Sequence, residues 1–160
     1  MASGARLFGH PIHQMLIVFP LGLLGMAVIF DVIRLVDGSA SLGIAAQAMI
    51  AAGVIAGLAA AVFGFIDWLA IPANTRAKRV GARHAIGNVI VVALFAVSWW
   101  LRRGDPTHPP SRAFVLALLG GGLSLITGWL GGELVNRLGI GPDEGANPNA
   151  RSSLSGRPAR

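Results

Sequence analysis

Two pairs of side chains in this chain have the types and spacing that suit a metal centre. His10 and His13 lie three residues apart just before a long apolar run, and His84 and Asn88 lie four residues apart at the start of a later one. A neutral imidazole is the commonest protein ligand of transition metals and an axial ligand of many haem groups. If the two runs are parallel helices of one bundle, His13 and His84 lie at the same depth. They then predict two axial ligands for a b-type haem.

The residues that follow each histidine indicate that both can face a bundle interior. With the 3.6-residue period of a helix, His13 shares a face with Ile17, Pro20, Leu24 and Asp31, and His84 shares one with Asn88, Val91, Phe95 and Ser98. Asp67 ends another apolar run, where it would orient one imidazole or close the pocket. The predicted cofactor-binding residues are therefore His13, His84, Asn88 and Asp67, with the basic residues of 76–83 beside the haem propionates.

Two other arrangements stay open from the residues alone. Imidazoles and carboxylates together form a nitrogen and oxygen ligand set for zinc, copper or iron. The residues that would supply this set are His10, His13, His84 and Glu133. Alternatively, the histidines lie at the headgroup boundary, and Asp67 and Glu133 pair with nearby arginines. The polar cluster would then only close the end of the bundle, with no cofactor bound.

The elements that must position these residues are membrane-spanning helices. Hydrophobic residues make up 54% of the 160 residues and charged residues 12%, against about 25% charged in soluble domains. There is no cysteine, which excludes disulfides, thiolate zinc sites and cysteine-ligated iron–sulfur clusters. The net charge of +6 comes from basic residues in loops beside apolar runs. The expected partner is therefore a lipid bilayer with anionic headgroups and not nucleic acid.

Four apolar runs have about the length that crosses the ~30 Å hydrocarbon core of a bilayer. We expect spans over residues 14–36, 42–71, 84–101 and 112–135, with a basic loop over 73–83 and a kink at Pro20. Short connections predict an all-α, integral membrane, up-down-up-down four-helix bundle over residues 1–147. An irregular, mobile tail is expected over 148–160. The sequence shows no internal repeat that would indicate a duplicated pair of hairpins.

Lysine and arginine are unevenly divided between the two ends of this bundle. The end with the termini carries nine of them: Arg6, Arg76, Lys78, Arg79, Arg83, Arg137, Arg151, Arg157 and Arg160. The other end carries four: Arg34, Arg102, Arg103 and Arg112. Cytoplasmic loops carry an excess of basic residues, so both termini are expected in the cytoplasm.

Several motifs recur in a known family. They are His10-Pro11-Ile12-His13 leading into Phe19-Pro20, then Asp67-Trp68, then His84 with Asn88, then the segment 128–135 (GWLGGELV) and the ending 139–147. With these motifs, residues 9–147 resemble the bacterial family named domain of unknown function 2231. The resemblance implies a small multi-pass protein of a bacterial inner (plasma) membrane. Some relatives are joined to Rieske-type or cytochrome domains, which implies a link to respiratory electron transfer. Asn136 and Leu138 stand where relatives often have an aromatic residue and a histidine, which weakens a ligand role at that end.

Three classes of function follow. The first is a haem- or metal-binding membrane module for respiratory electron transfer, with a redox protein or another membrane subunit as its partner. The second is a non-catalytic partner-binding or assembly subunit whose polar cluster only closes the bundle. The third is a proton or small-solute pathway built on carboxylates within the membrane. The sequence has no recognisable nucleophile–base set or phosphate-binding loop, so we do not expect the chain to be an enzyme by itself.

Overall fold

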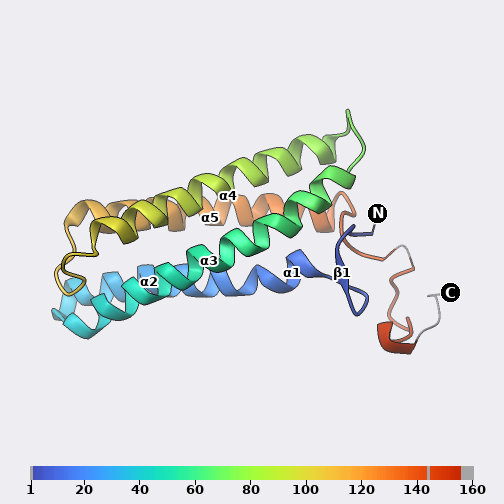
Figure 1. Cartoon of the computed structure of the whole chain (residues 1–160). Coiled ribbons are helices and arrows are strands. Elements are labelled where there is room, and N and C mark those ends of the chain that lie inside the picture. Colours follow the sequence, from blue (N-terminus) through green and yellow to red (C-terminus); the bar gives the residue numbers. More distant parts are fainter. Residues whose placement is uncertain (1, 144, 156–160) are drawn as a thin grey trace.

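The computed structural model describes residues 2–143 and 145–155, and it is built from four long helical rods (Figure 1). The first rod consists of α1 (Ile12–Leu16) and α2 (Val18–Asp37), and the others are α3 (Ala40–Ala70), α4 (Arg76–Leu101) and α5 (Ser111–Asn136). Each rod is long and apolar enough to cross a membrane. The predicted all-α four-helix membrane bundle is thus confirmed.

The first rod is interrupted at Ile17, where α1 ends and α2 begins. Pro20 has no N–H, so it cannot donate to the carbonyl of Leu16 as a helix requires. Hydrogen bonds on either side continue the rod, from Ile17 N to His13 O at 3.1 Å and from Leu21 N to Ile17 O at 3.2 Å. The kink expected at Pro20 is therefore a local break in helical hydrogen bonding one turn before the proline.

The third rod begins earlier than predicted, because residues 76–83 are the first turns of α4 and not a loop. Thr75 caps this helix, and its hydroxyl accepts a hydrogen bond from Lys78 N at 3.1 Å. Alanine, arginine and lysine, which make up six of the eight residues of this stretch, are good helix formers. His84 consequently lies more than two turns inside α4, and the helix extends beyond the start of the expected span of 84–101.

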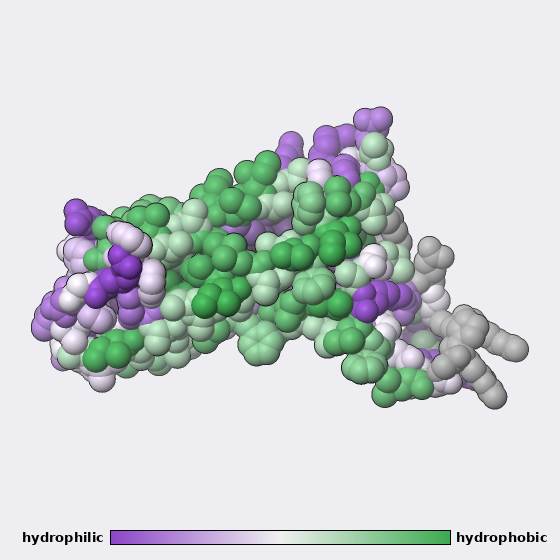
Figure 2. Space-filling view, viewed as in Figure 1, coloured by the Kyte–Doolittle hydropathy of each residue, from purple (hydrophilic) through white to green (hydrophobic). Residues whose placement is uncertain are grey.

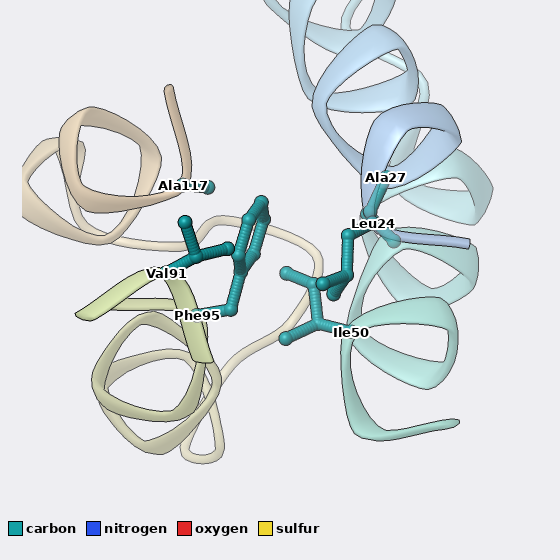
Figure 3. Packing of buried hydrophobic residues seen from close by; sticks show 7 residues of the cluster. Leu24, Ala27, Ile50, Val91, Phe95 and Ala117 are labelled. Atoms are coloured by element: carbon teal, nitrogen blue, oxygen red, sulfur yellow. The ribbon is translucent and has the colours of Figure 1, made fainter. Parts of the chain in front are cut away.

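Side chains from all four rods meet in the centre of the bundle. The buried cluster consists of Leu24, Ala27, Ala46, Ile50, Val91, Phe95 and Ala117. Leu24, Ile50 and Phe95 point toward one another across the interior (Figure 3). On the face that Figure 2 shows, the surface between the two ends is largely hydrophobic, as contact with lipid requires.

The start of the chain and the segment after α5 lie together at one end of the bundle (Figure 1). Strands β1 (Arg6–Leu7) and β2 (His10–Pro11) form a small antiparallel hairpin. Arg6 forms an ion pair with Asp143, and Ala2 makes a bridge to Gly141. Of the predicted tail, residues 148–155 are exposed and end in the short 3-10 helix η1 (Ser153–Ser155). Residues 156–160 lie outside the described residues, and the mobility of the tail stays a prediction.

Candidate functional site

His13 of α1 and His84 of α4 face each other inside the end of the bundle that holds the start of the chain. Their ring centroids are 6.3 Å apart and the ring planes are at 86°. Both residues are half-buried. The juxtaposition predicted from the two helical faces is confirmed, although the helix around His84 begins earlier than expected.

Each imidazole is held through its Nδ1 by a backbone carbonyl of the neighbouring rod. His13 Nδ1 lies 2.8 Å from Ala60 O of α3, and His84 Nδ1 lies 2.8 Å from Thr127 O of α5. A carbonyl oxygen only accepts hydrogen bonds, so these contacts assign the ring proton of each neutral imidazole to Nδ1. The lone pair of each ring is then on Nε2, the atom that can ligate a metal.

A glycine one turn after each carbonyl makes room for the ring. Gly64 follows Ala60 by four residues, and a Cβ at Gly64 would lie 2.8 Å from both Nδ1 and Cε1 of His13. Gly131 follows Thr127 by four residues, and a Cβ there would lie 3.2 Å from Cε1 of His84. In a helix the residue at i+4 lies beside the carbonyl of residue i. Because Gly64 and Gly131 have no side chain, each imidazole ring has room to approach its carbonyl.

These two contacts belong to an internal repeat that the sequence did not reveal. Equivalent positions of the first and third rods are 71 residues apart: 13 and 84, 24 and 95, 31 and 102. Equivalent positions of the second and fourth rods are 67 residues apart: 53 and 120, 60 and 127, 64 and 131. The sequence by itself did not indicate this duplicated hairpin, because only three of these six pairs, 13 and 84, 53 and 120, and 64 and 131, hold identical residues.

Contacts in the middle of the bundle follow the same offsets. A Cβ at Gly53 would lie 2.6 Å from Leu24 Cδ2, and a Cβ at Gly120 would lie 2.8 Å from Phe95 Cε2. The α2–α3 hairpin and the α4–α5 hairpin thus pack in the same way. Because equivalent rods run in the same direction, the two histidines come from the two hairpins at matching depth, which is the arrangement of a parallel repeat.

Asn88 and Thr127 add a polar network on the His84 side. The amide nitrogen of Asn88 lies 3.1 Å from His84 Nε2 and also donates to His84 O at 2.9 Å. The Thr127 hydroxyl donates to Asn88 Oδ1 at 3.0 Å. The structure thus places Asn88 beside the histidine pair, as predicted. Thr127 was missed, although it lies among small residues on α5 one turn before Gly131.

Asp67, the fourth predicted cofactor-binding residue, is engaged elsewhere. Its Oδ1 accepts hydrogen bonds from Ser3 Oγ at 2.6 Å, Gly4 N at 2.9 Å and Ala5 N at 3.3 Å. A carboxylate can accept several donors at once, and here it anchors the start of the chain to the end of α3. Asp67 therefore closes the bundle end and has no hydrogen bond to either imidazole.

The structure does not assemble the metal ligand set predicted from His10, His13, His84 and Glu133. His10 is exposed on the hairpin, with its Nε2 3.3 Å from Ser153 Oγ. Glu133 forms an ion pair with Arg76 at 2.6 Å. Over residues 2–143 and 145–155, no group of three or more histidine, cysteine, aspartate or glutamate side chains could hold a metal ion. His13 and His84 lie together, whereas His10 lies on the exposed hairpin and Glu133 is paired with Arg76.

The basic residues expected beside haem propionates are also partly engaged. Arg76 pairs with Glu133, and Lys78 Nζ lies 3.9 Å from the ring centroid of Trp68 and donates to its carbonyl at 2.7 Å. Arg79 and Arg83 line a pocket on the α4–α5 side that neither His13 nor His84 lines.

A family model described as "Predicted membrane protein (DUF2231)" matches residues 9–144. No curated protein and no solved structure matches the chain. The family match covers all four rods and both histidines of the pair, and its description names no reaction, ligand or partner.

Proposed function

Because the chain belongs to the DUF2231 family of predicted membrane proteins, we propose that it is a haem-binding module of the membrane with His13 and His84 as axial ligands. The observation that carries the proposal is the paired placement of the two imidazoles. They occupy equivalent positions of two repeated hairpins, 6.3 Å apart between ring centroids. Each donates its Nδ1 proton to a backbone carbonyl of the adjacent rod. Such a bond fixes the tautomer and orientation of a ligating histidine.

The separation of the rings suits one shared metal atom. Imidazole nitrogens bind metals at ~2.0–2.1 Å, so two rings on one atom have centroids roughly 5–6.5 Å apart. The observed 6.3 Å lies within this range. Asn88 is compatible with ligation by His84, because its amide has a second acceptor in His84 O and keeps a partner when Nε2 is taken by a metal.

The number of donors favours haem over a bare ion. Zinc in proteins takes four ligands in structural sites and three protein ligands in catalytic ones. Within the described residues only two imidazoles come together here. Haem needs only axial ligands from the protein, since its macrocycle supplies the rest. His13 and His84 would hold the haem, and the chemistry that it would supply there is electron transfer. The partner would then be a redox protein or another membrane subunit.

We further propose that this end of the bundle faces the cytoplasm of a bacterial inner membrane. The sequence count of basic residues is nine against four. Of the four at the other end, Arg102 is fully buried and paired with Asp31, so it is neutralised and does not contribute to that surface. At the histidine end Arg6 and Arg76 are likewise paired, with Asp143 and Glu133. Without these three paired arginines the count is seven against three, which supports the same orientation.

An absorption spectrum of purified protein, before and after addition of haem, tests the haem proposal. We expect the spectrum of low-spin haem with two imidazole ligands in the wild type and in His108→Ala, whose histidine lies in the loop at the opposite end. His13→Ala and His84→Ala should each lose it. Absence of this spectrum in haem-supplemented wild type would overturn the proposal, as would its retention in both single variants.

A second candidate is a subunit whose polar cluster only closes the bundle. It is favoured by the network of His84, Asn88 and Thr127, in which every side chain has a partner without a cofactor. In that case His84→Ala should lower the thermal midpoint of the protein, while neither haem nor any transition metal co-purifies with the wild type. Metal analysis of the sample used for the spectrum separates the two candidates.

A further inference from the structure

We propose that a basic pocket between the start of α4 and the end of α5 binds the phosphate of an anionic phospholipid. Its volume is about 340 Å³, and it is lined by Arg76, Arg79, Arg83, Trp129, Glu133 and two aliphatic side chains. Neither histidine of the pair lines it. The inference therefore does not depend on haem binding.

The pocket has an excess of positive charge. Arg76 and Glu133 pair at 2.6 Å and neutralise each other. The side chains of Arg79 and Arg83 are exposed and make no hydrogen bond or ion pair with any residue that the structure describes. Two guanidinium groups with their donors free are left beside the cavity, and guanidinium groups bind phosphate through paired hydrogen bonds.

The position of these arginines on the helix is unfavourable without an anion. Arg76, Arg79 and Arg83 are spaced to share one face of the first turns of α4. Like charges three and four residues apart repel, and the N-terminal end of a helix disfavours cations. A bound phosphate would offset both effects, because negative charge is favoured at this end of a helix.

The surroundings of the pocket favour a lipid over a soluble phosphate. Trp129 is 67% exposed, and tryptophan is enriched at the level of lipid headgroups. One turn deeper in α5, Leu125 and Ile126 are 74% and 59% exposed, and Ile86 of α4 is 62% exposed. A headgroup in the pocket would leave its acyl chains over this apolar surface. Basic pockets between membrane helices bind anionic headgroups in this way.

The other hairpin shows that the fold does not need this charge. The positions equivalent to Arg83, Trp129 and Glu133 are Ile12, Val62 and Ile66. Two hairpins that pack alike therefore differ here, with apolar residues in one and a charged pocket in the other. The arginines serve something other than the packing of the rods.

Phosphatidylglycerol binding to the wild type and two variants tests the proposal. The protein is placed in bilayer nanodiscs of phosphatidylcholine with or without phosphatidylglycerol, in the absence of added haem. Bound lipid is counted by native mass spectrometry, and the thermal midpoint is measured in parallel. R79Q/R83Q should bind phosphatidylglycerol about 30-fold more weakly than wild type, at about 1 kcal/mol for each guanidinium–phosphate hydrogen bond that is lost. The matched control R112Q/R137Q removes the same charge from exposed positions outside the pocket and should bind like wild type.

Each other outcome overturns a stated part of the inference. Equal weakening in both double variants would mean that only the overall charge matters, and the pocket would not be a site. If inorganic phosphate stabilises the wild type in phosphatidylcholine nanodiscs as much as phosphatidylglycerol does, the ligand is a soluble phosphate and the lipid assignment is wrong. Unchanged lipid binding in R79Q/R83Q with an unchanged thermal midpoint would exclude both a lipid and a soluble phosphate as the ligand of this pocket.

Discussion

The guanidinium group of Arg102 forms a two-pronged salt bridge with the carboxylate of Asp31 in the interior of the bundle, at the end opposite the histidine pair. The Nη1–Oδ1 distance is 3.0 Å and the Nη2–Oδ2 distance is 2.9 Å, and both side chains are 0% exposed. Nη2 also donates to Ser98 Oγ at 3.0 Å, and the Ser98 hydroxyl donates to Ala113 O at 2.6 Å. Asp31 and Arg102 occupy equivalent positions in the two hairpins, so this ion pair links one hairpin of the repeat to the other.

Replacing Asp31 by alanine should strongly destabilise the protein, because Arg102 would keep a buried charge with no partner. Loss of one member of a buried ion pair costs about 3–5 kcal/mol. The measurement is the free energy of unfolding in mixed micelles. The control is the double variant D31L/R102M, which leaves no charge and should be much closer to wild type. A small effect of D31A, or an equally large one of the double variant, would contradict this prediction.

Gly64→Ala should displace the His13 ring, because the new Cβ would lie 2.8 Å from Nδ1 and Cε1. Overpacking of this kind costs about 1–3 kcal/mol. Gly128→Ala on α5 is the matched control, since a Cβ there meets nothing within 4 Å. It should be neutral or stabilising, by up to about 1 kcal/mol from helix propensity. Equal thermal midpoints of the two variants would show that the ring does not need the space at Gly64.

Asp67→Ala should release the start of the chain from α3 while leaving the bundle intact. The backbone amides of Gly4 and Ala5 both donate to this carboxylate, so their hydrogen exchange should become faster. Asp67→Asn keeps one acceptor oxygen and should give a smaller change. Exchange that stays slow in Asp67→Ala would mean that other contacts hold this segment.

The loop between α4 and α5 should respond to acid. The hydrogen bond from the Thr107 side chain, supported by the backbone amides of His108 and Thr107, lowers the pKa of Asp105 below its ordinary value. Because the pKa of Asp105 is lowered in the folded loop, ionisation of Asp105 stabilises the loop at pH values above its ordinary pKa. This stabilisation is lost as the pH falls through the lowered pKa of the folded loop. Thr107→Val should move the pKa upward, measured by an NMR titration of the Asp105 carboxyl. An unchanged pKa would assign the shift to the remaining donors, which are the two backbone amides and the His108 side chain.

The proposed orientation can be tested with single cysteines, because the chain contains none. Ala73 lies between α3 and α4, Gly104 lies between α4 and α5, and both are exposed. In intact cells Gly104→Cys should react with a membrane-impermeant thiol reagent, and Ala73→Cys should react only after lysis. The reverse pattern would place the histidine end outside the cytoplasm.

The membrane class, the four rods and the facing of His13 and His84 could be predicted from the sequence. Composition excludes a water-covered surface, and helical periodicity places residues on faces without any knowledge of contacts. The same periodicity had placed Asp31 on the face of His13 and Ser98 on the face of His84. It did not indicate that Arg102, one turn after Ser98, would turn inward to meet Asp31.

Other features were decided only by the tertiary structure. Asp67 and Glu133 are carboxylates at the same end as the histidines, and spacing cannot tell which donor each will accept. In the folded chain Asp67 accepts hydrogen bonds from the start of the chain, and Glu133 forms an ion pair with Arg76. A buried or half-buried carboxylate binds the nearest donors because they compensate for its lost hydration. The early start of α4 depended on a cap at Thr75 that was read as part of a loop.

The internal repeat shows the same division. Periodicity along the chain fixed each rod by itself, since it depends only on the types of neighbouring residues. Leu24 and Phe95 differ in type, as do Asp31 and Arg102, but each pair occupies equivalent positions in the two hairpins. Only the packing of the side chains and the backbone that they contact shows this correspondence. Three of the six paired positions hold identical residues and three hold different ones in equivalent places, so the repeat became evident only in the folded chain.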